Sequence, residues 1–417
     1  MQVYKKVDVI TNKHPFSERE GVRHHVMDYI DWDEEFHVHR FTKDATEAIK
    51  DITLRGKIPI IVGGTHYYLQ NLLFKNKMIG QSYDLHDSLQ QKNLTQKEID
   101  ILDGLAEQLF AYLDKVDSVI AKKFHPQDRR KLRRALEVYF TTGRKPSELY
   151  NEQKLLELED SSLKYNTLFF WLYSDLEILR PKLEARVDNM LTNGALDEIK
   201  ELYEFYKERK MNTDCTTGVS QVIGFKEFLP WLRYNDNNKL FDEGTERMKI
   251  RTRQYAKYQI KWIKKLLAVE LHKESRFNYK NGGKIYLLDA SNLSSWNENV
   301  KDLGINIARQ FVELGPTSVT YQQAPDRLRD IFPSSSYISS INSNKILGSE
   351  KQWCHYECPI CINSDGKNLV AVGEENWNIH LHSRRHKRRE KLIERIERQR
   401  NMIHDIKESL PHNNNSL

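Results

Sequence analysis

The alternation of apolar and polar positions predicts an α/β protein with a largely parallel sheet. Three short runs rich in Val, Ile, Leu, Phe and Tyr have the length of buried strands, at residues 57–64, 165–174 and 284–292. Helical periodicity separates them, and the long helical patterns cover residues 129–139, 175–210 and 244–266. Strands that alternate with helices favour helices packed on a parallel sheet.

Changes in this pattern divide the chain into four parts. Residues 1–314 are expected to form the core, with a polar helical insertion at about residues 75–110. Residues 315–350 are rich in Ser, Pro and Asn and lack periodicity, which is typical of a linker. Residues 351–392 are expected to form a small separate module, and residues 393–417 a basic and polar helical tail.

Composition and charge narrow the class of protein. No apolar run approaches the roughly 18 residues that span a bilayer, so we expect a soluble chain that needs no membrane. The four cysteines are too few for a disulfide framework, which favours an intracellular protein. The net charge is only +6, but basic residues cluster at 122–134, 246–265 and 384–391. Such clusters indicate a polyanionic partner.

The loop after the first predicted strand is a candidate ligand site. Gly63 and Gly64 allow a close approach of the backbone to a ligand, and Thr65 stands where a helix begins and free amides attract anions. In open α/β sheets, ligands bind at the carboxyl ends of strands. The alternative is a tight turn in which Thr65 is an ordinary N-cap. The phosphate-binding pattern G-x-x-x-x-G-K-[ST] does not occur in the 417 residues.

The helical pattern over residues 244–266 carries a row of basic residues, here called the basic ridge. Its members follow one another at a spacing of four: Lys249, Arg253, Lys257, Lys261 and Lys265. Each like-charge pair costs roughly 0.2 to 0.5 kcal/mol, and a solvated face would intersperse acidic residues, so we interpret the ridge as a phosphate-binding surface. The alternative is a solvated face. The opposite side is expected to pack in the core through Met248, Tyr255, Gln259, Trp262 and Leu266.

Two Cys and two His near the C-terminus predict a structural zinc site. Cys358 and Cys361 are spaced C-x2-C, and His380 and His386 follow after a gap of 18 residues with the spacing H-x5-H. Two thiolates and two imidazoles at such spacings close a tetrahedral site. The gap leaves room for a hairpin that contains residues 366–373.

Two alternatives remain open for the zinc ligands. His382 lies four residues before His386 and could replace His380, and Cys354 could replace one of the thiolates. The basic run at 384–391 continues along the same element as the last His, which is typical of fingers that contact nucleic acids.

Six stretches carry a resemblance to a known family. In chain order they read IVGGTHYYLQ, HPQDRRKLRRALEVYFTTGRKPS, NGALDEIKELYEFY, VIGFKEFLPWL, TRQYAKYQIKWIKK and DGKNLVAVGEENWNIHLHSRRHK. Together they resemble the eukaryotic tRNA dimethylallyltransferases, also called tRNA isopentenyltransferases, from Met1 to about Arg389 with the linker excepted. The resemblance implies a P-loop-kinase-like core and a small C-terminal C2H2 zinc finger of the matrin/U1-like type.

The same resemblance implies a reaction and its partners. Enzymes of this family transfer a dimethylallyl group from dimethylallyl diphosphate to N6 of adenosine 37 in tRNA, with Mg²⁺ on the diphosphate. The implied partners are the tRNA anticodon stem-loop and dimethylallyl diphosphate, for a monomeric protein. We expect a cytoplasmic location, with the nucleus and the mitochondrion as alternatives.

By the resemblance, several positions contact tRNA or diphosphate. Met1 and Gln2 match a tRNA-contacting motif, and Gly63, Gly64 and Thr65 match the loop beside the target nucleotide. The other matching positions are Asp128, Arg129, Arg130 and Arg133 near the substrates, Gly224, Phe225 and Lys226 in a tRNA-facing turn, and Thr252, Arg253, Lys257 and Gln259 in the ridge helix. Tyr258 stands where the family has an arginine. The alternatives are structural: a simple turn at Gly224, and an ion pair of Arg133 with Glu137.

The family pattern also has a segment ahead of the position that matches Met1. It contains a phosphate loop, G-x-T-x-x-G-K-[ST], and an aspartate that is the proposed general base. We therefore expect an N-terminally truncated core that is deficient in catalysis, with Asp8 as the nearest carboxylate in sequence. Two hypotheses follow: a transferase whose first exon is missing from this sequence, and a non-catalytic, truncated paralogue that binds RNA.

Overall fold

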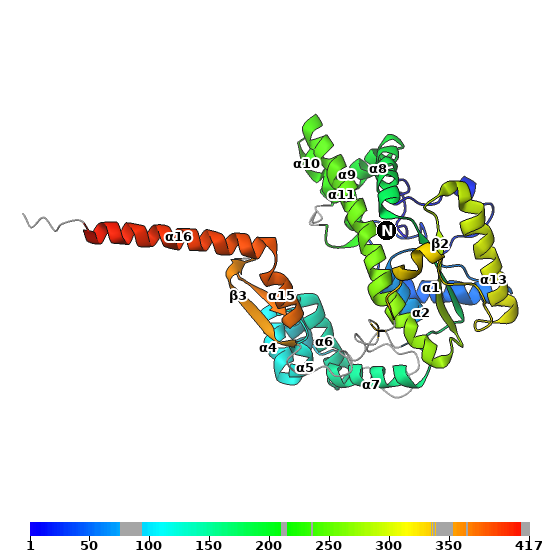
Figure 1. Ribbon diagram of the computed structural model, residues 1–417, viewed down its shortest axis with the longest axis horizontal. Coiled ribbons are helices and arrows are strands. Elements are labelled where there is room, and N and C mark those ends of the chain that lie inside the picture. The colour runs from blue at the N-terminus through cyan, green and yellow to red at the C-terminus, as the bar shows by residue number, and fades with distance from the viewer. Residues whose placement is uncertain are drawn as a thin grey trace, which may run out of the picture. The chain divides into compact units, whose positions relative to one another are not determined.

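The protein divides into two compact units, which are described separately (Figure 1). The computed structural model describes residues 1–75, 94–209, 215–234, 237–334, 336, 338, 353–363 and 366–409. Unit 1 comprises Met1–Lys77 and Glu159–Ile338, and unit 2 comprises Met78–Leu158 and Ser339–Leu417. Within the described ranges, no helix combines the length and the apolar character needed to cross a membrane.

A two-stranded parallel sheet lies at the centre of unit 1. Strand β1 (Thr167–Tyr173) pairs with β2 (Gly282–Asp289), and these strands correspond to two of the three predicted apolar runs. Successive side chains of a strand point to opposite faces. In β2, Ile285 therefore packs with Leu271 on one face, while Tyr286 packs with Ile307 on the other. The α/β class is thus confirmed.

The third predicted strand does not form. Residues 57–62 have irregular backbone, and the side chains of Ile58, Ile60 and Val62 are 63%, 84% and 91% exposed. Their composition is that of a buried strand, but a strand also needs a neighbour with which to exchange hydrogen bonds. Among the described residues, β1 and β2 pair only with each other, so the apolar run at 57–62 has no partner.

Helices make up most of the rest of unit 1 (Figure 1). They are α1 (Val38–Leu54), α2 (His66–Leu73), α8 (Leu176–Thr192), α9 (Ala195–Glu208), α10 (Phe225–Arg233), α11 (Asn238–Trp262), α12 (Ala268–His272) and α13 (Leu303–Leu314). The helix predicted over 175–210 is interrupted at Gly194, whose φ of 105° favours glycine. Helix α11 continues as a π-helix over Ile263–Leu267. The apolar faces of α8 to α11 share one core.

Part of the expected linker belongs to unit 1. A 3-10 helix over Asp326–Ile331 buries Leu328 in the same cluster as Ile285. Arg327 in this helix donates hydrogen bonds to Asp289 at the end of β2. The linker prediction missed these few buried apolar residues because Ser, Pro and Asn dominate the composition of the segment. Residues 339–350 lie outside the described ranges.

Unit 2 contains a helical part that is longer than the predicted insertion. Its helices are α3 (Gln96–Leu102), α4 (Ala106–Val116), α5 (Ser118–Ala121), α6 (Arg129–Thr142) and α7 (Pro146–Glu159). Leu109 and Leu113 of α4 are fully buried together with Leu132 and Leu136 of α6. Because the apolar stripe of α6 packs on α4, the unit extends well beyond residue 110. Residues 76–93 lie outside the described ranges.

The finger region of unit 2 is a hairpin followed by two helices. Strand β3 (His355–Ile362) pairs antiparallel with β4 (Asn368–Val372), which lies inside the predicted hairpin. Helix α15 (Glu374–Leu381) leads to α16 (Arg384–Ser409). Since α16 runs without a break through residue 392, the last helix of the finger continues into the predicted tail.

Candidate functional site

The loop at Gly63 to Thr65 lies against helix α11. A Cβ on Gly64 would lie 2.7 Å from Oε1 of Gln259, so glycine permits this close approach. Thr65 occupies the N-cap position of α2, but its side chain makes no capping hydrogen bond. The Thr65 side chain instead forms a hydrogen bond with Tyr255 of α11. The ordinary N-cap alternative is therefore wrong for this side chain.

His66 secures the loop to the same helix, and the sequence analysis missed it. Its ring stacks on Trp262 with centroids 3.6 Å apart and planes 4° from parallel. The residue is only 7% exposed, and neither ring nitrogen has a hydrogen bond to a described residue. Burial lowers the pKa of His66 to about 4, while the nearby Gln259 amide opposes that shift. At neutral pH the imidazole is therefore uncharged.

One face of α11 makes all of these contacts. Tyr255, Gln259 and Trp262 are separated by four and three residues, so they lie above one another on the helix. They belong to the side that the sequence analysis expected to pack in the core. Met248 on that side is buried as expected, but Tyr255 and Leu266 are 47% and 45% exposed, so the core prediction is wrong for these two residues.

The first half of the basic ridge is neutralised by α8. Nζ of Lys249 lies 2.7 Å from Asp188, and Arg253 forms an ion pair with Glu184. These carboxylates remove the like-charge cost that suggested a free anion-binding surface over the whole ridge. The like-charge argument therefore does not apply to these two residues, because it considered α11 without its neighbour, and the contact of Arg253 with tRNA stays a prediction.

The second half of the basic ridge remains available. Lys257, Lys261 and Lys265 are exposed and form no ion pair within the described part of the chain. Arg186 on α8 is a further candidate, since partial desolvation lowers the pKa of its guanidinium and no described carboxylate pairs with it. The sequence analysis missed Arg186 because acidic residues flank it along the helix.

The basic residues of α6 mostly hold unit 2 together. The guanidinium of Arg129 donates to the carbonyl oxygens of Leu102, Asp103 and Gly104 at the end of α3. Asp128 accepts a hydrogen bond from the backbone N–H of Lys131 and caps α6.

Arg133 and Arg130 differ in their surroundings. Arg133 lies 3.6 Å from Asp103, whereas Glu137 pairs with Arg134, so the predicted Arg133 pair with Glu137 does not form. Arg130 has no ion pair with a described residue and remains the freest of the predicted positions in α6.

The turn at Gly224 is built into the core of unit 1. Gly224 has a φ of 115°, and a Cβ there would lie 2.7 Å from Cδ1 of Ile10. Phe225 is fully buried, which makes it a packing residue, while Lys226 is exposed. Of this predicted group, only the Lys226 side chain reaches solvent.

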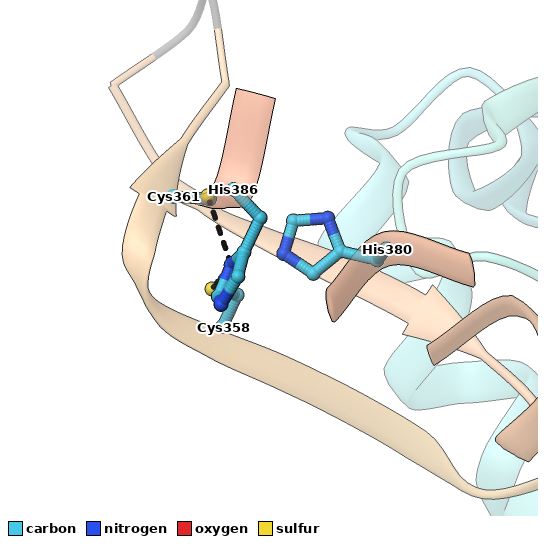
Figure 2. Close-up of side chains that lie close together, drawn as sticks. All are labelled: Cys358, Cys361, His380 and His386. Carbon is cyan, nitrogen blue, oxygen red and sulfur yellow. Dashed lines mark hydrogen bonds between the residues drawn. The ribbon is translucent and has the colours of Figure 1, made fainter. Parts of the chain in front are cut away.

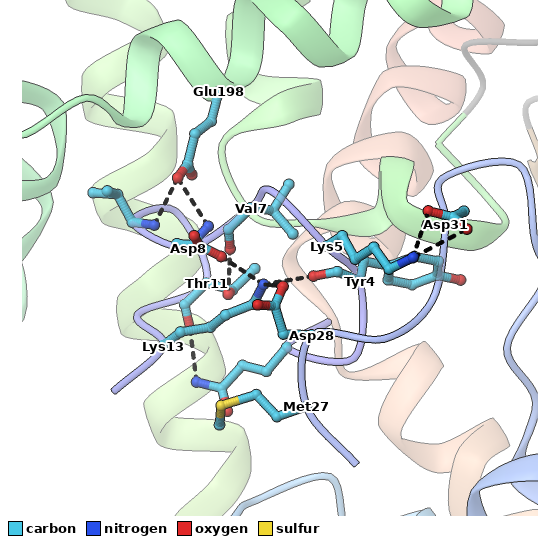
Figure 3. Close-up of polar contacts among 12 residues, drawn as sticks. Tyr4, Lys5, Val7, Asp8, Thr11, Lys13, Met27, Asp28, Asp31 and Glu198 are labelled. Carbon is cyan, nitrogen blue, oxygen red and sulfur yellow. Dashed lines mark hydrogen bonds and ion pairs between the residues drawn. The ribbon is translucent and has the colours of Figure 1, made fainter. Parts of the chain in front are cut away.

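The first residues of the chain form a fixed loop, shown in Figure 3. Glu198 accepts hydrogen bonds of 2.8, 2.8 and 2.9 Å from the backbone N–H groups of Asp8, Val9 and Ile10. Lys13 is buried and donates 2.6 Å hydrogen bonds to the Tyr4 carbonyl and to Asp8.

Gln2 is held by the same loop. Its side-chain amide donates to the carbonyl oxygens of Thr11 and Asn12 at 3.0 and 2.9 Å. Met1 beside it is 41% exposed. The predicted tRNA-contacting residues therefore sit on a rigid segment, with the Gln2 amide directed into the loop.

The predicted zinc ligands come together in unit 2 (Figure 2). Cys358 and Cys361 from β3, His380 from α15 and His386 from α16 place their ligand atoms within 4.8 Å of one another. The Sγ atoms of Cys358 and Cys361 lie 3.6 and 3.5 Å from Nδ1 of His386. Tetrahedral zinc bonds of about 2.3 Å to sulfur and 2.0 Å to nitrogen separate such ligands by about 3.6 Å.

Two further observations fit a metal at this cluster. Nε2 of His380 is buried without a hydrogen-bond partner among the described residues. Burial lowers the pKa of His380, which favours the neutral imidazole that a metal requires. His382 bonds instead to the Asn378 carbonyl of its own helix, and Cys354 lies outside the cluster.

Comparison with known proteins identifies the relatives of this chain. The IPP transferase family profile matches residues 2–266. The chain belongs to the IPP transferase family. A tRNA dimethylallyltransferase of Saccharomyces cerevisiae is 47% identical over 391 residues, which cover 93% of this chain and 83% of that protein. Another from Schizosaccharomyces pombe is 38% identical and covers 96% of this chain and 89% of its own length.

A solved structure supports the same relationship. A crystal structure of a eukaryotic dimethylallyltransferase acting on tRNA has a TM-score of 0.77 and 46% sequence identity, covering 96% of this chain and 90% of that one. The resemblance drawn from the six sequence stretches is confirmed. Since its relatives are named tRNA dimethylallyltransferases, which are prenyltransferases, the chain is an enzyme of this class by resemblance.

We expect the purified 417-residue chain to contain about one zinc per molecule, because the four ligands satisfy a tetrahedral ion. His386→Ala should lose most of this zinc, as measured by mass spectrometry of the metal. The matched control is His382→Ala, which should keep its zinc. Equal loss from both variants would contradict the assignment of the fourth ligand.

Stability should fall as the pH decreases from 6.5 toward 4 because of His66. The folded protein has a pKa of about 4 and the unfolded chain one of about 6.5, so above pH 6.5 both hold a neutral ring. At pH 5.5 the unfolded state gains the proton first, which costs about 1 kcal/mol of stability. His66→Phe keeps a ring beside Trp262 and should remove this part of the pH dependence.

Urea unfolding followed by tryptophan fluorescence at pH 7.5 and 5.5 measures the difference. The comparison between the native chain and His66→Phe cancels the other titrating groups. The same loss of stability in both proteins would show that the His66 ring is solvated.

Proposed function

We propose that this IPP transferase binds the anticodon arm of tRNA and serves to transfer a dimethylallyl group from its diphosphate to N6 of adenosine 37. The observation that carries this proposal is that one helix, α11, holds the loop at Gly64 on one face and carries the free half of the basic ridge on another. A Cβ on the neighbouring Gly63 would meet nothing within 4 Å, so the backbone there is open to a flat base, and the exposed lysines can bind phosphate.

The residues present support binding and positioning. Lys257 and Lys261 attract phosphate groups, and Arg186 offers a planar guanidinium without a competing carboxylate. His66 stays uncharged and therefore does not add a fixed charge beside the loop. Tyr255 and Gln259 hold the loop in place, which preorganises the surface for its ligand.

The chemistry places further requirements on the site. The N6 amine of adenine is a poor nucleophile, so a positioned carboxylate that takes its proton accelerates transfer by typically 10²- to 10⁴-fold. A departing diphosphate needs a cradle of cations and amides. Asp8 is committed to Lys13. We therefore infer that a polypeptide of these 417 residues alone is deficient in transfer.

Magnesium is expected to accompany the diphosphate. Of the described residues, only the Cys and His cluster of the finger groups three or more potential metal ligands. Mg²⁺ on a diphosphate usually needs only one or two protein carboxylates, because phosphate oxygens and water complete its coordination. Magnesium would supply charge neutralisation on the diphosphate.

Replacing Lys257 and Lys261 together with alanine should weaken tRNA binding and flatten its dependence on salt. The slope of log K against log salt is negative, and each lost phosphate contact reduces its magnitude by about 0.7 to 0.9. The magnitude of the slope for the double variant should therefore be smaller by about one to two. Lys50→Ala is the matched control, because Lys50 is an exposed lysine on α1. The tRNA affinity of each variant is measured from 50 to 200 mM salt. An unchanged slope in the double variant would show that these lysines do not contact tRNA phosphates.

Transfer activity should depend on a phosphate loop. The 417-residue chain should yield little N6-dimethylallyl product from tRNA, magnesium and dimethylallyl diphosphate, since its cradle and base are incomplete. A fusion that adds a family segment with G-x-T-x-x-G-K-[ST] and the general-base aspartate ahead of Met1 should restore product. Comparable product from both proteins would refute the deficiency. A fusion that binds tRNA but stays inactive would favour the alternative of a non-catalytic RNA-binding paralogue.

A further inference from the structure

Two histidines join the finger to the helical part of unit 2. His355 of β3 donates from Nε2 to the carbonyl oxygen of Phe124 at 2.9 Å. His125, the next residue along from Phe124, donates from Nε2 to the carbonyl oxygen of Val370 in β4 at 3.2 Å. The two bonds run in opposite directions between the same two segments, so each side contributes one donor and one acceptor.

The tautomer of His125 is fixed by its own loop. Its Nδ1 accepts a hydrogen bond of 3.1 Å from the backbone N–H of Gln127. A ring nitrogen that accepts carries no proton, so the proton of the neutral ring lies on Nε2. The loop therefore holds His125 ready to donate to Val370.

Two more contacts flank this pair. The ring of His355 lies 5.6 Å from that of Phe110 in α4, at an angle of 47°. Lys367, in the turn of the finger hairpin, forms an ion pair with Glu107 at the start of α4. Together the four contacts span both strands of the hairpin.

We propose that these contacts form a clasp that docks the finger on α4 and the loop at Phe124, so that the finger and the helical part bind RNA as one body. The RNA part of this proposal rests on the function proposed above. Each contact is weak alone. Segments of one chain meet at a high effective concentration, so a few weak contacts suffice to dock them.

Docking has a consequence for RNA binding. Arg130 of α6 is free of ion pairs with described residues, and the start of α16 exposes Arg384, Lys387, Arg388 and Lys391. In a docked unit the spacing between these charges is set before RNA binds. RNA binding then does not have to order the finger relative to the helical part, so affinity is higher without any added phosphate contact.

Zero-length carbodiimide cross-linking of the full chain tests the clasp. Lys367 should become linked to Glu107 in the native chain. The internal reference is Lys6 with Glu201, an exposed pair 3.3 Å apart in unit 1. In the double variant His125→Ala, His355→Ala, the Lys367 link should fall at least fivefold relative to the reference. His382→Ala is the matched control and should keep the link.

Zinc content and tRNA binding complete the test. The double variant should keep its zinc, which shows that the finger itself remains folded. Its tRNA affinity should fall about three- to tenfold while the salt slope stays the same, since no phosphate-contacting charge is removed.

Three results would overturn parts of this inference. Absence of the Lys367 link in the native chain, or its persistence in the double variant, would refute docking. Loss of the link with unchanged tRNA affinity would refute the coupling to RNA. Failure of the native chain to bind tRNA would instead refute the proposed function, while the cross-link would still report on docking.

Discussion

The contact between one face of α11 and the loop at Gly64 is the constraint on which the candidate site depends. Gly64 lacks the Cβ that would displace Gln259, and His66 stacks on Trp262 one turn further along the helix. Because Tyr255 lies on the same face, a single rigid helix positions the loop at three points. The basic ridge belongs to that helix, so its direction relative to the loop is fixed as well.

Charge compensation decides which part of the ridge can meet a ligand. Asp188 and Glu184 of α8 pair with Lys249 and Arg253, which ties the two helices together and removes the repulsion between the first basic neighbours. An ion pair already formed must be broken before phosphate can take its place. The remaining lysines carry no such competition, so the part of the ridge that is free to meet an anion is shorter than the row of basic residues in the sequence.

The sequence pattern correctly predicted features that depend on short stretches of the chain. The strands at 165–174 and 284–292 and the helix from residue 129 formed as expected, because apolar content and periodicity reflect burial directly. The four Cys and His side chains cluster as their spacing indicated.

Features that depend on distant partners could not be predicted. Residues 57–62 have the composition of a strand but no described neighbour, and the burial of His66 depends on Trp262, which lies 196 positions later in the chain.

A count of basic residues therefore overestimates the surface available to a polyanion. Arg129 closes the end of α3, Arg253 ties two helices, and Lys13 is buried beneath the first loop. Each is as basic as Arg130 or Lys257 in the sequence, yet it already donates hydrogen bonds to other groups of the protein. Since counterion release reflects only charges that reach phosphate, the electrostatics of tRNA binding should follow the few unpaired side chains, and the structure, rather than the net charge of +6, determines which those are.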